Sequence, residues 1–368
     1  MSRVYNFNPG PATLPLPVLE RAQAELLDYQ GQGISILEAS HRSKPYEAIN
    51  SEAETRIKRL LNLGDDYRVL FLQGGASLQF AMLPLNFLPA GAVADYILSG
   101  SWSEKAQKEA ENVAASLSPT ATVHVAGSTA AENYCRIPGA NELSLSAAPA
   151  YVHITTNNTI YGTQWHTLPD VGAIPLVADM SSDILSRPFE ASRFALFYAG
   201  AQKNLGPAGV TVVVVQKQWL EQAAKHIPVY LRYSTHAQND SLYNTPPTFA
   251  VYMLNLVLGW IEEQGGLVAM GERNQQKAAA IYAVIDQHAG FYQGHATPDS
   301  RSLMNITFRL PTAELEQRFV SEATAAGMIG LKGHRSVGGI RASIYNAMSR
   351  EGCQTLADFM RVFVQKHG

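Results

Sequence analysis

FYAGAQKNLGPAG, residues 197–209, places a single lysine, Lys203, between an apolar run and a group of glycines. The apolar run predicts a buried strand, and the glycines allow the backbone to turn sharply after it. Burial lowers the proton affinity of an amine, so Lys203 is expected to be partly present as the free base that attacks a carbonyl group. An arbitrary lysine is more often a solvated loop residue. The surroundings of this one favour the chemical role.

A carboxylate ends the apolar run before it. Residues 174–179, IPLVAD, predict another buried strand with Asp179 at its carboxyl end, which is the edge where open α/β sheets bind ligands. A carboxylate there can keep a pyridine nitrogen protonated while a lysine reacts with an aldehyde on the same ring. Asp179 also fits a helix cap, because Ser181, Ser182 and Asp183 follow it. Together with Lys203, it predicts pyridoxal 5′-phosphate as the cofactor.

Short apolar runs alternate with polar, helix-like stretches between about residues 67 and 215. This rhythm is typical of a mostly parallel sheet flanked by helices, and the nearly all-valine run 210–215 fits a strand covered on both faces. The expected strands are 67–72, 93–98, 121–125, 151–155, 174–179, 195–199 and 210–215. The predicted fold class is therefore α/β, with a seven-stranded, mostly parallel sheet in a large domain.

The pattern changes after about residue 266. We expect helices at 271–287 and 314–326, a half-exposed alternating strand at 304–309, a strand at 340–345 and a last helix with Leu356, Phe359, Met360 and Phe363 on one face. Upstream, Pro45 and Gly64 bracket an amphipathic helix over residues 45–62. The expected domains are a large one at 16–262 and a small α+β one at 263–368, with segment 1–15 packing near the active site.

The composition is that of a globular protein. The chain has 368 residues, 46% of them hydrophobic, which suffices for a large core and about two domains. Its net charge is only −3 and its basic residues are dispersed, which argues against binding to nucleic acid or an anionic membrane.

No apolar run approaches the roughly 20 residues of a membrane span. Two cysteines, Cys135 and Cys353, make neither a disulfide framework nor a zinc cluster, so no metal is expected. The first eleven residues lack the apolar stretch of a secretory signal, so we expect a cytoplasmic protein.

Residues 73–77, QGGAS, join the first expected strand to a helix that carries Phe80 and Leu83. A glycine turn that leads into a helix N-terminus binds phosphate through free backbone amides and the helix dipole. The spacing matches neither a Walker motif nor a dinucleotide fingerprint. Because such turns are common, this one gains weight only in combination with Lys203 and Asp179.

Seven short motifs follow one another along the chain. They are FNPGPA (7–12), SHR (40–42), GGAS (74–77), AGAQKN (199–204), NTPPT (244–248), KGHR (332–335) and RASIYN (341–346). In this order they closely resemble the phosphoserine aminotransferases, a family of class V, fold-type I enzymes that use pyridoxal phosphate. The resemblance extends from the first ten residues to the last helix.

The resemblance implies roles for single residues around the cofactor. Lys203 would be the Schiff-base lysine and Asp179 the partner of the pyridine nitrogen. Trp102 would stack on the ring and Thr159 would lie near its phenolic oxygen, although composition alone favours core packing for the first and an ordinary turn for the second. The cofactor phosphate would contact Ala76, Ser77, Gln202 and, from the other subunit of a homodimer with shared active sites, Asn244 and Thr245.

The substrates 3-phosphoserine and L-glutamate both carry two anionic ends, which suit the planar fork of arginine. The resemblance implies that Arg341 holds the α-carboxylate. The distal phosphate or γ-carboxylate would be held by His41, Arg42, His334 and Arg335, and which subunit supplies each stays open. Each arginine taken singly fits a surface ion pair. Ser77 and Pro9 replace an arginine and a serine found in some members, so contacts to glutamate at these two positions also stay open.

The implied activity is reversible transamination between L-glutamate and 3-phosphohydroxypyruvate, giving 3-phosphoserine and 2-oxoglutarate in serine biosynthesis, with a further use in pyridoxine biosynthesis open. Two alternatives stand beside it. A different class V enzyme is one, but a cysteine desulfurase needs a mobile nucleophilic cysteine, and an alanine–glyoxylate transaminase has no use for two His-Arg pairs. A non-catalytic binding protein is the other, and the intact Lys203 and Asp179 argue against it.

Overall fold

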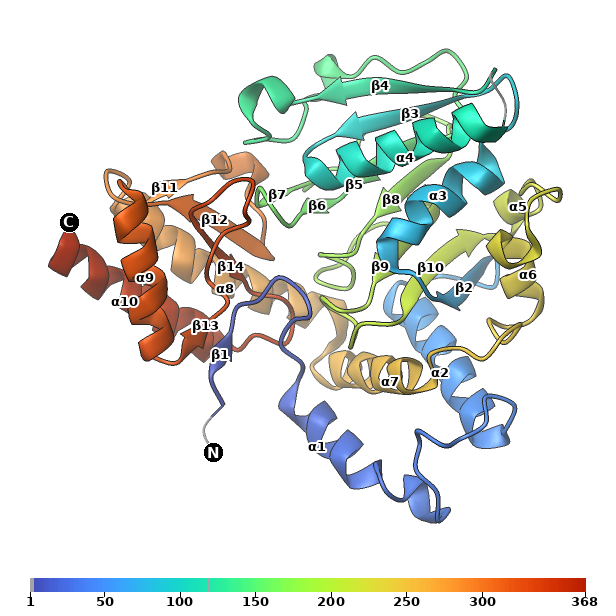
Figure 1. Ribbon diagram of the computed structural model, residues 1–368, viewed down its shortest axis with the longest axis horizontal. Coiled ribbons are helices and arrows are strands. Elements are labelled where there is room, and N and C mark those ends of the chain that lie inside the picture. Colours follow the sequence, from blue (N-terminus) through green and yellow to red (C-terminus); the bar gives the residue numbers. More distant parts are fainter. Residues whose placement is uncertain (1–2, 118–119) are drawn as a thin grey trace.

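A seven-stranded sheet forms the centre of the computed structural model, which describes residues 3–117 and 120–368 (Figure 1). Its strands are β2 (Tyr67–Leu72), β3 (Val93–Leu98), β4 (Thr122–Ser128), β5 (Val152–Thr155), β8 (Leu176–Asp179), β9 (Phe194–Gly200) and β10 (Thr211–Gln216). The spatial order is β2-β10-β9-β8-β5-β3-β4. β10 runs antiparallel to both of its neighbours, and the other six strands are parallel. The predicted mostly parallel sheet of seven strands is confirmed.

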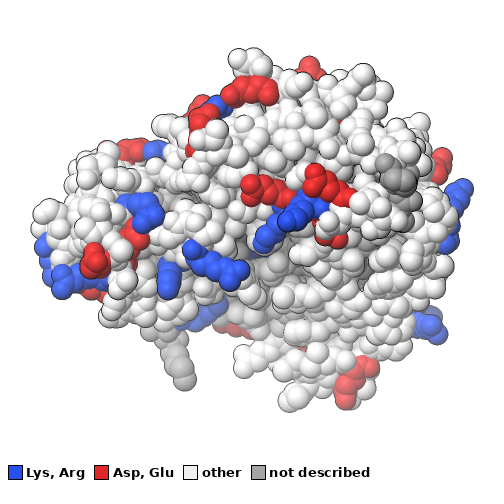
Figure 2. All heavy atoms as spheres, turned by 45° about the horizontal axis from the view of Figure 1, so that its top comes forward, with Lys and Arg blue, Asp and Glu red and all other residues white. Residues whose placement is uncertain are grey.

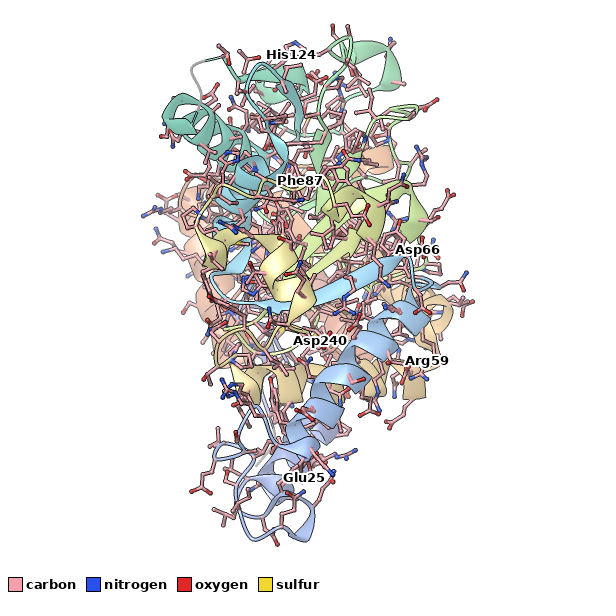
Figure 3. All side chains as sticks on the ribbon, turned by 90° about the vertical axis from the view of Figure 1, so that its right-hand side faces the viewer. Glu25, Arg59, Asp66, Phe87, His124 and Asp240 are labelled. Carbon is pink, nitrogen blue, oxygen red and sulfur yellow. The ribbon has the colours of Figure 1, made fainter. Side chains whose placement is uncertain are left out.

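Helices cover both faces of this sheet, which explains why its strands read as continuous apolar runs. In β10, Val212 and Val214 belong to the core shared with α2 (Lys44–Leu60) and α7 (Thr248–Glu263). Val213 and Val215 belong to the core shared with α3 (Gly75–Phe87) and α4 (Ser101–Leu117). In Figure 3, Arg59 on α2 and Phe87 on α3 accordingly lie on different sides of the sheet.

The C-terminal part has a core of its own. It contains α8 (Gly266–Gln287), α9 (Ala313–Ala325), α10 (Arg350–His367) and a three-stranded sheet in the order β11 (Gln293–Gly294), β12 (Asn305–Arg309), β14 (Ile340–Ser343). The N-terminal strand β1 (Tyr5–Asn6) pairs in parallel with β13 (Met328–Ile329), which ties the start of the chain to this part. The helices and strands predicted for this part lie within five residues of their expected bounds, whereas β1, β11 and β13 were not predicted. The division into domains at residues 262 and 263 stays a prediction.

The remaining short elements are α1 (Leu16–Glu25), α5 (Lys217–Leu220), α6 (Tyr233–Gln238), β6 (Asn157–Asn158) and β7 (Thr163–Gln164). Glu25, at the end of α1, marks one end of the molecule, and His124 on β4 lies at the other (Figure 3). Among residues 3–117 and 120–368, no helix has both the length and the apolar character that a membrane crossing requires.

The expectation of a half-exposed strand at residues 304–309 is wrong. β12 is buried from Asn305 to Phe308. Its apolar residues face the C-terminal core, and its polar residues are covered by the β6–β7 hairpin. Asn157 Nδ2 donates to Asn305 Oδ1 at 2.8 Å, and Thr307 Oγ1 donates to the carbonyl oxygen of Ile160 at 3.4 Å. The alternation therefore marks an internal polar contact between the two parts of the chain, rather than a solvated face.

Candidate active site

The carboxyl ends of the parallel strands meet at one edge of the sheet, and the expected chemical groups gather there. β2 ends at Leu72, and α3 begins three residues later at Gly75. Gly74 and Gly75 have φ angles of +87° and +64°, which favour glycine. At Gly74 a Cβ would also lie 2.6 Å from Leu78 Cβ. The turn points the first backbone amides of a 13-residue helix at the cavity described below, which is the geometry expected of a phosphate site.

Lys203 follows β9 on the neighbouring loop. Its Nζ donates to Thr159 Oγ1 at 2.6 Å and lies 5.8 Å from the centroid of the Trp102 ring. Burial lowers the pKa of Lys203 to about 8, although the negative charge of Asp179 opposes this shift. Near neutral pH a useful fraction of this amine is therefore unprotonated, as a nucleophile or general base requires.

Asp179 ends β8 and is only 5% exposed. Burial raises its pKa, while hydrogen bonds from Ser181 and the charge of Lys203 oppose the rise. The backbone amide of Ser181 donates to Asp179 Oδ1 at 2.9 Å, and the chain from 181 to 187 continues as turns and bends instead of a helix. The alternative role as a helix cap therefore has no helix to act on, and the carboxylate lines the same cavity as Lys203.

This cavity has a volume of about 130 Å³. The residues that line it are Gly75, Ala76, Ser77, Trp102, Thr155, Asn157, Thr159, Asp179, Ser181, Ser182, Gln202 and Lys203. Seven of the residues expected around the cofactor are thus brought together. Thr155, Asn157, Ser181 and Ser182 were not anticipated as site residues. Their signal was present in the sequence, because each follows or ends a buried strand next to a residue that was anticipated.

The N-terminal segment lies directly against the lysine loop. The Ala12 amide donates to the carbonyl oxygen of Gln202 at 2.9 Å, and Tyr345 Oη donates to that of Pro9 at 2.8 Å. Gly10 has a φ of +143°, and a Cβ there would lie 3.4 Å from Lys203 Cγ. This close approach explains a glycine at position 10.

Arg341, on β14, brings a buried positive charge to the site. The residue is 6% exposed, its Nη1 donates to the carbonyl oxygen of Thr159 at 3.4 Å, and burial lowers its pKa. Within residues 3–117 and 120–368 its Nε has no hydrogen-bond partner, and no carboxylate pairs with its guanidinium. A buried cation without an anion is costly, so Arg341 is arranged to receive one from a ligand.

His334 and Arg335 lie on the loop before β14 and extend this positive region. Burial lowers the pKa of His334, and the charges of Arg341, Arg335 and Lys105 lower it further. His334 is half-buried and Arg335 is exposed. The lowered pKa favours a neutral His334 ring near neutral pH, so Arg335 and Arg341 supply the positive charge that suits a substrate with two anionic ends.

Seven expected residues do not line this cavity: Arg341, His334 and Arg335, described above, and four that lie further away. His41 and Arg42 lie in the turn before α2. There the Arg42 amide donates a hydrogen bond to Ser40 Oγ at 3.3 Å, within the same turn. Asn244 Nδ2 donates to Gln73 Oε1 at 3.4 Å, beside the start of the glycine turn, and Thr245 is exposed. Within one chain these four residues lie away from the cavity, Arg42 and Thr245 exposed and His41 and Asn244 half-buried.

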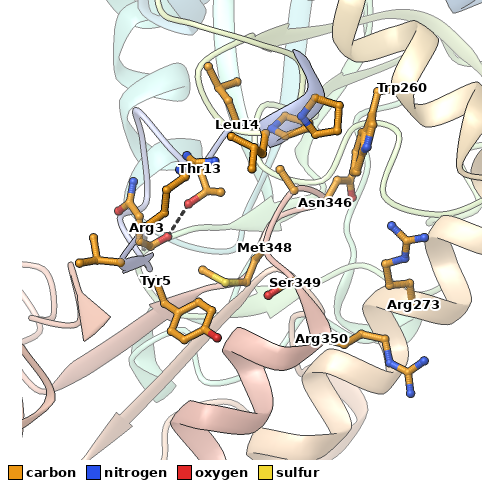
Figure 4. Close-up of a pocket in the computed structure, with 16 residues that line it drawn as sticks. Arg3, Tyr5, Thr13, Leu14, Trp260, Arg273, Asn346, Met348, Ser349 and Arg350 are labelled. Atoms are coloured by element: carbon orange, nitrogen blue, oxygen red, sulfur yellow. Dashed lines mark hydrogen bonds between the residues drawn. The ribbon is translucent and has the colours of Figure 1, made fainter. Parts of the chain in front are cut away.

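A larger cavity of about 520 Å³ lies between the N-terminal segment and the start of α10 (Figure 4). Arg273, Arg350 and Trp260 stand at one side of it, and Arg3 and Tyr5 stand at the other. Its lining offers no lysine and no carboxylate. It therefore lacks the groups for carbonyl chemistry, and the Lys203 cavity is the candidate active site.

Comparison with known proteins agrees with this geometry. Residues 4–356 match the family model "Aminotransferase class-V". Proteins named phosphoserine aminotransferase from Herpetosiphon aurantiacus and Halalkalibacterium halodurans are 62% and 58% identical, over 99% and 100% of this chain and the same shares of theirs. This chain belongs to the phosphoserine aminotransferase family.

Solved structures of the phosphoserine aminotransferase family share the whole fold. That of the Bacillus circulans subsp. alkalophilus enzyme has a TM-score of 0.96 and 54% identity, covering 100% of this chain and 99% of the other. A pyridoxal-phosphate-bound phosphoserine aminotransferase from Trichomonas vaginalis has a TM-score of 0.93 and 39% identity, covering 98% and 100%. The predictions of family and of fold type I are confirmed.

Proposed function

We propose that this chain is a phosphoserine transaminase, which moves the amino group of L-glutamate to 3-phosphohydroxypyruvate and yields 3-phosphoserine and 2-oxoglutarate. Its cofactor is pyridoxal 5′-phosphate. The observation that carries the proposal is the meeting of the Lys203 amine and the buried Asp179 carboxylate around one cavity. The buried Arg341 guanidinium lies beside it, bonded to the Thr159 carbonyl and close enough to lower the pKa of Lys203. The names of the relatives at 52–62% identity support the same activity.

The side chains present fit this cofactor. Lys203 would hold its aldehyde carbon, Asp179 its pyridine nitrogen, Trp102 the face of its ring and Thr159 its phenolic oxygen. The amides at the start of α3, with Ala76, Ser77 and Gln202, would hold its phosphate. Thr155 Oγ1 is a buried hydroxyl in the same lining without a hydrogen-bond partner among the described residues, as expected where a polar ligand belongs.

The chain's own groups divide the work of the reaction. Pyridoxal phosphate, when bound, supplies an aldehyde that condenses with amines and a ring that accepts negative charge from the substrate α-carbon. The Lys203 amine removes the α-proton as a general base, and the resulting ammonium then acts as a general acid. Asp179 keeps the ring nitrogen protonated, and Arg341 orients the α-carboxylate so that the Cα–H bond faces Lys203.

Four expected site residues lie away from the cavity of their own chain, which leads us to propose a homodimer with shared sites. His41 and Arg42 would reach the distal anion of the substrate, and Asn244 and Thr245 the cofactor phosphate, in the other subunit. Exposed apolar side chains on the preceding segment support a covered surface there, since Leu27, Ile34 and Leu37 are 86%, 43% and 56% exposed. The protein should therefore have twice the 40.0 kDa mass of the chain in solution, as measured by light scattering.

The proposed setting is serine biosynthesis in the cytoplasm. A phosphorylated four-carbon acid of pyridoxine biosynthesis is a second candidate substrate, because it carries the same pair of carboxylate and distal phosphate. A desulfurase activity is disfavoured. Cys353 is fully buried on α10, and burial raises the pKa of its thiol to about 11, so it offers no thiolate near neutral pH.

The activity is tested by comparing two amino donors. Wild-type protein loaded with pyridoxal phosphate should transaminate 3-phosphoserine with 2-oxoglutarate far faster than it transaminates alanine. Arg335→Ala and Arg42→Ala should each lower kcat/KM for phosphoserine by roughly ten- to a hundredfold, since each removes a charge-assisted hydrogen bond, and should leave alanine turnover nearly unchanged. Equal losses on both donors would show that these arginines support the fold or the cofactor, and a wild-type protein without phosphoserine turnover would refute the proposed function.

A further inference from the structure

Lys105, in the first turns of α4, stands at the edge of the candidate active site. Its Nζ lies 4.3 Å from the centroid of the Trp102 ring, one helical turn earlier, which is a cation–π distance. Trp102 lines the Lys203 cavity, and Lys203 Nζ lies 5.8 Å from the same ring centroid. The Trp102 ring thus links the Lys105 ammonium to the cavity that holds the reacting amine.

The positive charge of Lys105 also acts on the opposite side of the site. His334, more than 200 residues later in the chain, has its pKa lowered by Lys105 as well as by Arg341 and Arg335. Figure 2 shows Lys and Arg side chains gathered around the hollow between the two parts of the molecule. Helix α4 and the loop before β14 therefore present cations to one shared space.

No carboxylate among the described residues forms an ion pair with Lys105, His334 or Arg335. Lys105 forms no ion pair within residues 3–117 and 120–368, and its neighbour Glu104 accepts a hydrogen bond from Tyr134 Oη at 2.6 Å. In the cavity lining, Lys203 faces the Asp179 carboxylate. Lys105 and Arg335, outside that lining, have no such partner, and an anionic ligand between them would be attracted by both charges.

We infer that Lys105 is a specificity-determining residue that binds the distal anionic group of the substrate, the phosphate or the γ-carboxylate. This inference rests on the proposed function. Lys105 acts together with His334 and Arg335 from the same chain, and its flexible ammonium serves as a point charge for phosphate. It does not touch the reacting atoms, so its effect falls on substrate binding and on the choice of donor.

The test compares Lys105→Gln with the matched control Lys108→Gln, which removes an exposed lysine one turn further along the same helix. Lys105→Gln should raise KM for phosphoserine and lower kcat/KM about tenfold, with kcat at saturation nearly unchanged. Alanine turnover should stay within about twofold in both variants. An unchanged kcat/KM for phosphoserine in Lys105→Gln, or an equal loss on alanine, would overturn the inference.

A second readout needs no activity. In the cofactor-free protein, NMR titration of the His334 ring should give a higher pKa in Lys105→Gln, because a neighbouring positive charge has been removed, and an unchanged pKa in Lys108→Gln. Inorganic phosphate should shift the His334 resonances of the wild type and do so more weakly in Lys105→Gln. If phosphoserine turnover were absent in the wild type, the proposed function would fail while this titration still tested the anion site. A His334 ring that responds identically in all three proteins would contradict the role of Lys105.

Discussion

Lys203 and Lys277 are two lysines with lowered pKa values and different surroundings, the first half-buried and the second buried. Burial lowers the pKa of both, to about 8 for Lys203 and about 7 for Lys277. Lys277, on α8, is 1% exposed, and its Nζ donates to the carbonyl oxygens of Ile344, Tyr345 and Met348 at 2.8, 2.7 and 3.1 Å. Lys203 donates to one hydroxyl, that of Thr159, and lines an open cavity.

The difference shows that a lowered pKa alone does not mark a reactive amine. All three protons of the Lys277 ammonium are taken by fixed carbonyl groups, so its nitrogen has no free direction from which to attack a ligand. It instead holds the turn between β14 and α10, where the Asn346 amide donates to Asn204 Oδ1 at 3.0 Å, next to Lys203. Lys203 is thus the lysine we propose for the chemistry, whereas Lys277 bonds to the turn that contacts the lysine loop.

The largest expected effect comes from Lys203→Ala. Loss of the amine removes the carbonyl anchor and the proton carrier together, so kcat should fall at least about a thousandfold. The folded structure and non-covalent binding of the cofactor should persist, because the Lys203 amine makes a single hydrogen bond. Stopped-flow turnover, circular dichroism and cofactor titration provide the measurements. Ordinary turnover in this variant would end the assignment of Lys203.

The second effect is on stability and comes from Lys277→Met, which has a similar length but no donor. The carbonyl oxygens of Ile344 and Met348 would lose this donor, whereas that of Tyr345 still accepts from the Met348 amide at 2.9 Å. Each unsatisfied group costs about 1–3 kcal/mol, partly offset because the buried ammonium is no longer desolvated. We expect a net loss of about 2–4 kcal/mol in the free energy of unfolding and a Tm lower by several degrees.

Activity separates the two lysines in this experiment. The kcat per folded Lys277→Met molecule should stay within about threefold of wild type, because the three residues that accept its hydrogen bonds do not line the Lys203 cavity. A variant of unchanged Tm and abolished kcat would show that Lys277, like Lys203, takes part in the reaction. The distinction drawn between the two lysines would then be wrong.

These two lysines also show how far the sequence alone could lead. Lys203 was identifiable because the signal is local, a lysine between an apolar strand and glycines, with Asp179 at the end of the strand that precedes it in the chain. Lys277 was not identifiable. It lies within the predicted helix 271–287, and its three acceptors come from residues nearly seventy positions later. Long-range contacts of this kind depend on how α8 packs against the chain after β14.

The same limit applies to the strands and to Lys105. Strand bounds were predictable to within a few residues, because burial on both faces imposes a continuous apolar run. The burial of β12 was not, since its polar partners Asn157 and Ile160 belong to a hairpin of the other part. The sequence did not distinguish Lys105 from the four other charged residues of its helix, because only the fold brings α4 opposite His334.

The smallest effect is a pH shift that compares the amines directly. In the cofactor-free protein, labelling of Lys203 by an amine-reactive reagent should reach half its maximal rate near pH 8, because only the unprotonated amine reacts and its pKa is about 8. Ordinary exposed lysines should do so near their usual pKa of about 10.4. Lys277 should remain unlabelled while the protein is folded, despite its lower pKa, since its nitrogen is enclosed by three carbonyl groups.

Two variants test the direction in which neighbouring charges move the pKa of Lys203. Asp179→Asn removes a negative charge that favours the ammonium, so the Lys203 midpoint should move to lower pH, and Arg341→Gln removes a positive charge that disfavours it, so the midpoint should move to higher pH. Mass spectrometry of the labelled peptides across pH measures all of these midpoints. Labelling of Lys277 at a rate close to that of Lys203 would mean that a lowered pKa is sufficient for reactivity after all, and that the free directions of the nitrogen do not decide which lysine reacts.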